Sequence, residues 1–391
     1  MPLGRVSEVA TDNEPVRIAY THGGDAEEAA GNLRLQLPID DYSAIVAFFS
    51  SEYDARAIAT AMAKHFPCTS VFGCTTAGEL GPRGIGDGGM LAMAFRSRDF
   101  SVVASRIKDI DALQFDGVRD NIRQARTVLT ELEDGALGRN RFGLLLVDGL
   151  CLHEEPLVST IGACLDDIPV VGGSAGDGDA FGETWVVFDG EAHRNAAVLL
   201  LVSTELPCRP FKCNSFAPTS TKLVVTEADV EKRIVRELNA EPAAREYARI
   251  VGVLESDLNG HVFAAHPVIV RVGGDYYARS IQRVNDDGSL TFFCAIDEGL
   301  VLTAAGRLDT LGVVEQMFRD TEAELGEISV YIGFDCLHRR LDAEQRQIIR
   351  DMEDLYVRHK VVGFNTYGEQ YESMHLNQTF SGVAVGKRKP Q

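Results

Sequence analysis

Three stretches of the chain repeat one order of apolar and polar positions. Each begins with an apolar run, continues into an amphipathic segment of about 15 residues, and ends in a valine-rich run that leads into a glycine-containing turn. The apolar runs are rich in β-branched and aromatic residues, which favour strands, whereas the longer segments have helical periodicity. The repeats lie at residues 44–79, 142–177 and 328–369. The pattern predicts an α/β protein whose mixed β-sheets, built from strand-helix-strand units, are covered by helices.

A two-domain organisation follows from where the repeats lie. The first two precede residue 204 and the third closes the chain. Between them, residues 204–221 contain three prolines and no clear periodicity, which is typical of a crossing between domains. Beyond the crossing we expect a helix at 230–238 and consecutive strands between 263 and 296. The predicted divisions are an N-terminal extension at 1–30, a first domain at 31–203, a linker at 204–221 and a second domain at 222–388.

The charge of the chain restricts its partners. Lys and Arg number 38 and Asp and Glu 58, so the formal net charge is −20. A surface of this charge repels DNA, RNA and anionic lipid. The sequence also has no apolar run near the roughly 20 residues that span a bilayer, and no apolar signal segment at its start. We therefore expect a cytoplasmic protein that binds neither nucleic acid nor membrane.

Two glycine motifs resemble phosphate-binding loops but lack the required charge. Segments 73–78 and 363–368 both have the spacing Gly-x-x-x-x-Gly. A phosphate loop continues with lysine, whereas Glu79 and Glu369 follow these glycines and would repel phosphate. Turns that need glycine at strand ends explain both segments better than nucleotide binding does.

Motifs of nucleophilic catalysis are also incomplete. Segment 172–176 has the Gly-x-Ser-x-Gly form of a nucleophile elbow, but the glycine-rich residues after it cannot open the helix that the elbow requires. Cys336 and His338 would face opposite ways as alternate residues of a strand. The eight cysteines form no Cys-x-x-Cys pair, which favours reduced thiols over zinc or redox sites. We do not expect an enzyme.

Two histidines have positions of interest. His266 precedes Pro267 at the head of an apolar strand, so its ring should be partly buried. His375 lies just before the last strand of the chain. Each is either a hydrogen-bonded structural histidine or an axial ligand of a cofactor.

Blocks of sequence along the whole chain resemble the FIST family, a sensor module with an N-terminal and a C-terminal part. VFGCTTAGEL, DGLCLHEE and PVVGGSAGD resemble the first part, and FDCLHRR, VVGFNTYGE and HLNQT resemble the second. The likeness covers residues 31–388. Within the family, segments 263–303 and 374–386 are most similar to the stand-alone bacterial NosP proteins. Cys151 and His153 depart from the family pattern, which puts any role of these two positions in doubt.

The resemblance implies a cofactor and a partner. NosP proteins are described as haem-binding nitric oxide sensors that regulate a histidine kinase, so the chain is expected to be a cytoplasmic nitric oxide sensor acting on a separate kinase. His266 is then the expected ligand of the haem iron, with His375 as the alternative, and Arg279 and Arg339 are the cations near the propionates. The alternative is a FIST module that binds a small metabolite, such as an amino acid, at the glycine turns without haem. Assembly into a homo-oligomer is left open.

Overall fold

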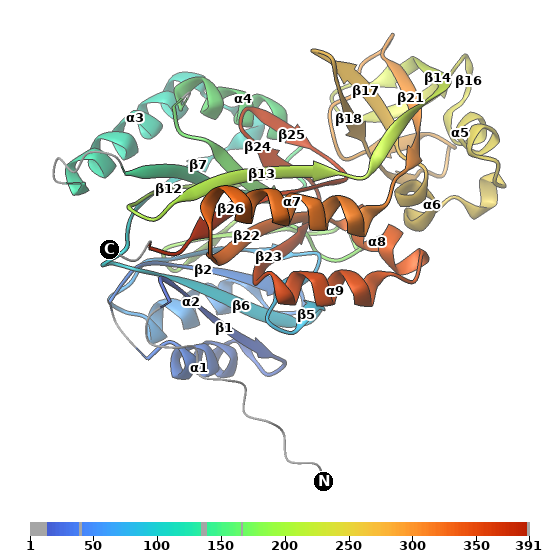
Figure 1. Cartoon of the computed structure of the whole chain (residues 1–391). Helices are drawn as coiled ribbons and strands as arrows, with labels where there is room; N and C mark the ends of the chain where they lie inside the picture. The colour runs from blue at the N-terminus through green and yellow to red at the C-terminus, as the bar shows by residue number, and fades with distance from the viewer. Residues whose placement is uncertain (1–13, 39–40, 134–138, 166, 389–391) are drawn as a thin grey trace.

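The computed structural model describes residues 14–38, 41–133, 139–165 and 167–388. It confirms an α/β fold in which helices cover mixed sheets, and it contains three similar units and one inserted domain (Figure 1). Each unit begins with an edge strand and a helix. A strand, a helical segment and a second strand follow, and these two strands are parallel neighbours. A short hairpin and a last strand complete the unit. In the described part of the chain, no helix is both long and apolar enough to cross a membrane.

The elements of the three units follow the chain. Unit 1 comprises β1 (Val16–His22), α1 (Ala26–Gln36), β2 (Tyr42–Ser50), α2 (Ala55–His65), β3 (Val71–Thr76), β4 (Glu79–Gly81), β5 (Gly84–Gly86) and β6 (Gly89–Arg96). Unit 2 comprises β7 (Phe100–Lys108), α3 (Phe115–Leu132), β8 (Asn140–Val147), α4 (Glu154–Cys164), β9 (Val170–Ser174), β10 (Val186–Phe188), β11 (Glu191–His193) and β12 (Ala196–Thr204). Unit 3 comprises β13 (Cys208–Asn214), α7 (Thr310–Leu325), β22 (Ile328–Cys336), α8 (Leu337–Gln345), α9 (Ile349–Arg358), β23 (Val361–Thr366), β24 (Glu369–Tyr371), β25 (Met374–Leu376) and β26 (Thr379–Gly386).

The inserted domain interrupts unit 3 between β13 and α7. Its elements are β14 (Phe216–Asp229), β15 (Ile234–Leu238), β16 (Glu241–Pro242), α5 (Ala243–Val251), α6 (Gly260–Ala265), β17 (Val268–Val272), β18 (Asp275–Arg279), β19 (Ile281–Val284), β20 (Leu290–Phe292) and β21 (Val301–Arg307). The chain leaves the core through β14 and returns through β21, and these two strands pair with each other from Phe216 and Arg307 onward. The inserted domain is therefore joined to the core by two adjacent strands.

Each unit places its hairpin in the sheet of another unit. The hairpin of unit 1 extends the sheet of unit 3 through β4 and β23, and that of unit 2 extends the sheet of unit 1 through β10 and β3. The hairpin of unit 3 in turn extends the sheet of unit 2 through β24 and β9. The exchange closes a ring, in which each sheet is completed by the hairpin of one other unit.

Glycine at one equivalent position of each unit permits this packing. A Cβ at Gly73, Gly172 or Gly363 would lie 2.1, 1.9 or 1.7 Å from the backbone oxygen of a neighbouring strand. Atoms do not approach this closely, so any side chain there would push the strands of the parallel pair apart. These glycines therefore serve backbone packing and do not form a phosphate loop.

The domain division expected from the sequence differs from the structure. Residues 204–221 are not a linker, because β13 and the first residues of β14 occupy them and β13 pairs with β26 along its whole length. Within the expected extension at 1–30, residues 16–22 form β1 and pair with β6. The two bodies are a core of residues 14–214 and 310–388 and an inserted domain of residues 216–307. Phe211 is the one buried apolar side chain of β13, which is why no alternation was visible there.

The helix expected at residues 230–238 is also wrong. Residues 234–238 form β15, which pairs with β14 on one side and β20 on the other. Arg233 has a left-handed backbone, with φ of 55°, and it turns the chain between β14 and β15. Pairing on both sides of a strand outweighs the local capping pattern on which the prediction rested.

Buried carboxyl groups hold the turns that follow β3 and β23. Glu79 accepts hydrogen bonds from the Thr76 hydroxyl, at 2.6 Å, and from the Gly89 N–H, at 3.0 Å. Glu369 repeats the arrangement with the Thr366 hydroxyl and the Thr379 N–H. In units 1 and 3 the carboxyl group ties the turn to the start of the last strand. Glu79 and Glu369, which stand where a phosphate loop has lysine, therefore have a structural role.

Replacing Glu79 with Gln tests this clamp through its pH dependence. Burial raises the pKa of Glu79 to about 7, against the opposing effect of its hydrogen bonds. Because the pKa is higher in the folded than in the unfolded chain, the contribution of Glu79 to stability is present at low pH and falls as pH rises through about 4.5 to 7. Glu79→Gln should therefore gain stability relative to wild type between pH 5 and pH 8, as measured by urea unfolding. Glu241→Gln, at an exposed position, is the control, and a constant difference between Glu79→Gln and wild type would contradict the assignment.

Candidate functional site

Three turns interlock at the carboxyl ends of the parallel strands. The Ala77 N–H donates to the backbone oxygen of Asn365 at 3.0 Å, and the Gly176 N–H donates to the backbone oxygen of Thr75 at 3.1 Å. The Ser174 N–H donates to the oxygen of Gly368 at 2.8 Å. Ligands of α/β proteins commonly bind beyond the carboxyl ends of parallel strands, so the surroundings of these turns are the place to look for a site.

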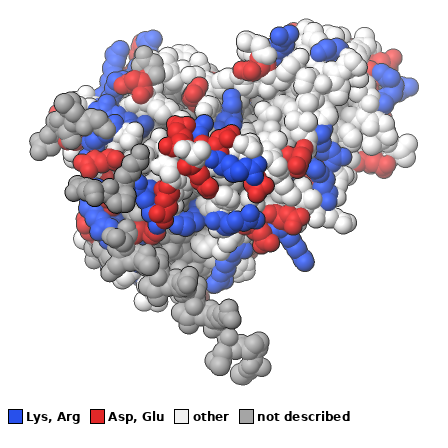
Figure 2. Space-filling view, in the orientation of Figure 1, with Lys and Arg blue, Asp and Glu red and all other residues white. Residues whose placement is uncertain are grey.

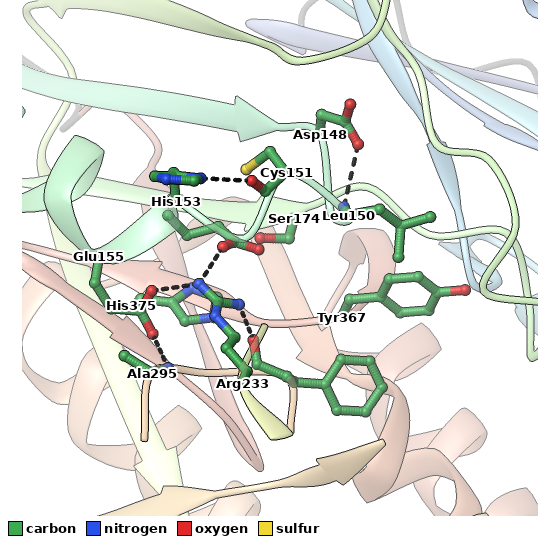
Figure 3. A network of polar contacts seen from close by, with 12 residues as sticks. Asp148, Leu150, Cys151, His153, Glu155, Ser174, Arg233, Ala295, Tyr367 and His375 are labelled. Atoms are coloured by element: carbon green, nitrogen blue, oxygen red, sulfur yellow. Dashed lines mark hydrogen bonds and ion pairs between the residues drawn. The ribbon is translucent and has the colours of Figure 1, made fainter. Parts of the chain in front are cut away.

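The inserted domain contacts the core at the turn of unit 2. Arg233, only 3% exposed, lies between Glu154 and Glu155 at the N-terminus of α4, with N–O distances of 2.6 and 2.5 Å (Figure 3). Its guanidinium also donates to the backbone oxygen of Phe293, while the Ala295 N–H donates to Glu155 at 2.6 Å. We call this buried ion pair the latch, because it connects the two bodies of the molecule.

The latch depends on several opposing effects. The positive end of the α4 dipole stabilises Glu154 and Glu155, whereas burial of the charges of Arg233 and Glu154 is costly. The left-handed backbone of Arg233 adds strain, which a residue other than glycine tolerates only where its surroundings hold it. Loss of Arg233 would leave both carboxylates without a counterion, whereas loss of one glutamate would leave Arg233 paired with the other. The contact between the bodies is therefore specific and sensitive to a change in any of its charges.

Beneath α4, three polar side chains of the core form a chain of hydrogen bonds. The Gln370 amide nitrogen donates to the Ser174 hydroxyl, at 2.9 Å, and to Nδ1 of His375, at 3.2 Å. Burial lowers the pKa of His375, which is 4% exposed, so its imidazole is neutral at pH 7. Since Nδ1 accepts, the proton is assigned to Nε2, and Nε2 has no hydrogen-bond partner within residues 14–388 as described.

The inserted domain brings further unpartnered groups to the same place. The Ser280 N–H donates to Oδ1 of Asn377 at 3.3 Å, next to His375, but the Ser280 hydroxyl has no partner among the residues that the structure describes. Arg279 forms no ion pair there either: its Nε has no acceptor, and one Nη reaches only the Ala278 oxygen at 3.3 Å. We call Ser174, Arg279, Ser280, Gln370 and His375 the joint cluster.

A cavity of about 420 Å³ adjoins the joint cluster. It lies between the core strands β13 and β25 and the inserted strand β18, and Asn377 belongs to its wall as well as bonding Ser280. The ammonium group of Lys212 is also at this cavity, 5.5 Å from the centre of the Tyr277 ring and 5.0 Å from that of Tyr371. The volume suits a small metabolite.

A larger cavity, of about 900 Å³, lies at the carboxyl ends of β2 and β3. Arg56 and Arg194 lie beside the Trp185 ring there, at 5.0 and 5.7 Å from its centre. Its wall also includes Thr75, whose hydroxyl already accepts a hydrogen bond from the backbone N–H of Trp185. Buried polar atoms without partners gather at the joint cluster, which is therefore the stronger candidate despite its smaller cavity.

Of the four residues singled out from the sequence, the structure brings His375 and Arg279 to the joint. His266 is half-buried at the end of α6, and its backbone oxygen accepts from the Tyr247 hydroxyl at 2.7 Å. Arg339 is a buried residue of α8 that pairs with Asp335 of the core. His266 and Arg339 thus lie outside the joint cluster. Sequence reasoning missed Arg233, Ser280 and Gln370, for which no local pattern exists.

His375 as placed does not fit the role of a haem ligand. An axial ligand needs a ring nitrogen that faces room for the macrocycle. No histidine belongs to the wall of any of five cavities found over the described residues. Nε2 of His375 instead lies against Gly368, where a Cβ would come within 2.6 Å of it. Nor do the described residues contain a group of three or more His, Cys, Asp and Glu side chains arranged to hold a metal ion.

Together, the repeated core and the inserted domain, with a polar interface between them, define an α/β protein of two bodies. Residues 43–241 match the FIST N domain and residues 243–372 the FIST C domain, so the chain belongs to the FIST family, whose domains are sensory signalling modules. A protein of Methanocaldococcus jannaschii, described only as uncharacterized, is 24% identical over 82% of this chain and 69% of its own length. The two matches meet beside β16, inside the inserted domain, so neither corresponds to a structural body.

Substituting Gly368 tests the packing of His375. A Cβ at this position would lie 2.2 Å from Cε1 of His375, so Gly368→Ala should displace the ring and lower stability by about 1–3 kcal/mol in urea unfolding. Gly117→Ala on α3 is the control, because the nearest atom to its Cβ is 3.8 Å away and helical glycine is unfavourable. Equal stability of Gly368→Ala and wild type would contradict the described contact.

Removing the latch charge tests how the bodies dock. Arg233→Met leaves the buried Glu154 and the partly exposed Glu155 without a counterion and should cost about 3–5 kcal/mol. Amide hydrogen exchange is expected to accelerate at the start of α4 and at Ala295. Arg236→Met is a matched control on β15, since Arg236 is 45% exposed and its acidic neighbours lie 3.6 to 3.8 Å away. Unchanged exchange in Arg233→Met would show that the latch does not hold the bodies together.

Proposed function

We propose that this protein is a sensor that binds a small polar metabolite, such as an amino acid, at the joint between its core and its inserted domain, without turning it over. One observation carries the proposal: where the two bodies meet, beside a cavity of about 420 Å³, buried polar groups of both bodies lack hydrogen-bond partners among the described residues. Buried polar groups are almost always satisfied, so a cluster of unsatisfied ones favours a bound molecule. The site lies close to the glycine turn after β23.

Docking of the inserted domain supplies a signal that a partner can read. A ligand that contacts both bodies stabilises the docked arrangement by its difference in affinity for the docked and undocked states. The latch and the two-strand connection at β14 and β21 are the elements that such a ligand would bias. A histidine kinase, as the resemblance implies, is the partner class that we propose.

The surface charge is compatible with a protein partner. On the face shown in Figure 2, acidic and basic side chains alternate over α7 and α9, and several form ion pairs, such as Arg319 with Glu315. A continuous basic patch, which nucleic acid requires, is not present on this face.

A ligand screen tests the proposal. A metabolite panel that includes the amino acids is added to the purified protein, and a binder is expected to raise the thermal midpoint with its concentration. Ser280→Ala, which removes a hydroxyl of the joint cluster, should weaken that binder about tenfold by calorimetry. Ser256→Ala, at an exposed position, should bind as wild type does.

Haem sensing is the competing function, and an absorption spectrum separates the two. The protein is expressed with haem precursor, reduced and exposed to nitric oxide. We expect no Soret band. A strong band that shifts with nitric oxide and is lost in His266→Ala or His375→Ala would replace the metabolite proposal with the haem sensor that the resemblance implies.

A further inference from the structure

The first strand of each unit lies at the edge of its sheet, and two of these three edges are protected. In unit 1, the side-chain amide of Gln36 binds both backbone groups of Tyr20 on β1: it accepts from the N–H at 3.1 Å and donates to the oxygen at 2.9 Å. In unit 3, β13 contains Pro210, which has no N–H, between the charged Arg209 and Lys212. Such side chains hinder the pairing of an edge strand with another chain.

The third edge, that of β7 in unit 2, has neither kind of protection. Among the described strands, β7 pairs only with β12, and its residues 101–105, Ser-Val-Val-Ala-Ser, include no charge and no proline. Val102 and Ala104 pack against the apolar interior shared by the sheets, and Val103 packs against the cluster beneath α3. All three are only partly buried. A nine-residue strand with an edge of this kind is a template for pairing with a further strand.

The helix that covers β7 continues the uncharged surface. One stripe of α3, at helical spacing, is exposed and uncharged, and it comprises Gly117, Asn121, Gln124, Val128 and Leu132. The charged side chains of α3 lie outside this stripe, and Arg126 pairs at 2.6 Å with Asp167, just beyond the end of α4. Since α4 adjoins α3 on that flank, the uncharged stripe is on the opposite flank, towards the free edge of β7.

Charge and symmetry favour a second copy of this chain as the partner. With a net charge of −20, two copies repel each other over most of their surfaces, so they can approach best where the surface is uncharged. Segment 101–105 also reads almost the same in both directions. An antiparallel pair centred on Val103 therefore sets Ser101 opposite Ser105 of the other copy, in register with itself.

The size of the surface is sufficient for a dimer. β7 and α3 have 9 and 18 residues, so each is about 30 Å long. One layer of strand and one of helix, each about 10 Å thick, then offer roughly 600 Å² on each copy. The total of roughly 1,200 Å² reaches the lower limit of specific protein interfaces.

We infer that two copies of this chain associate through β7 and the uncharged stripe of α3. An antiparallel pair of β7 strands about a two-fold axis joins two six-stranded sheets into one continuous sheet and satisfies the free edge of each. Figure 1 shows α3 and the inserted domain at opposite sides of the molecule, so the inserted domain stays free to dock in each copy. The inference does not depend on the ligand of the joint.

The mass in solution tests the strand pairing through two matched double variants. Sedimentation should show wild type rising from 42.6 kDa towards twice this mass as its concentration increases from about 1 to 100 µM. Ser101→Lys combined with Ser105→Lys sets lysine opposite lysine twice across the axis and should weaken association at least about tenfold. Ser101→Lys combined with Ser105→Glu sets lysine opposite glutamate at the same positions and should associate as wild type does. Urea unfolding checks that both double variants are folded.

The helix stripe is tested by a separate pair of variants. Leu132, 54% exposed, would be covered by α3 of the other copy. Leu132→Lys places a charge in this contact and should weaken association about tenfold. Leu254→Lys is the control, because Leu254 is 69% exposed and belongs to the inserted domain.

Three outcomes overturn the inference. A wild type that remains at 42.6 kDa up to about 100 µM shows that copies of this chain do not pair, and it leaves the edge of β7 to a different protein. If the variant with two lysines associates as wild type does, the dimer uses another face. If the lysine–glutamate variant dissociates as readily as the variant with two lysines, the strands do not pair antiparallel about Val103.

Discussion

The exchange of hairpins among the three units is the constraint on which the rest of the molecule depends. Each sheet is incomplete until another unit contributes two short strands, so the three units stabilise one another around a common hydrophobic interior. Equivalent glycines allow the strands to approach, and buried glutamates hold two of the turns that lead into the hairpins. The turns are thereby fixed at the carboxyl ends of the parallel strands.

The inserted domain has the opposite character. It is joined to the core by two adjacent strands, and it contacts unit 2 through a buried ion pair whose arginine has a strained backbone. Such a contact is strongly favourable only when every charge has its partner, which makes docking specific while leaving it open to competition. The polar groups of the joint cluster lie at the same interface. The latch and the joint cluster therefore belong to one contact between the two bodies.

The two arginines of the joint have different surroundings. Arg233 has two carboxylate partners in the latch, whereas Arg279 forms no ion pair among the described residues and lies near the neutral His375. The same geometry disfavours haem, since the ring nitrogen of His375 faces the backbone and not an open space.

The sequence by itself determined the strand-helix-strand units, their glycine turns and the FIST family, because hydrophobic periodicity and motif spacing are local properties of a chain. It also singled out His375 and Arg279, through family resemblance. Only the tertiary structure decided that β13 is an edge strand, that residues 234–238 pair as a strand, and that each hairpin belongs to another sheet. These outcomes depend on pairing between distant segments, which no local pattern records. For the same reason the joint cluster was invisible in the sequence: its residues, from Ser174 to His375, become neighbours only when the inserted domain docks on the ring.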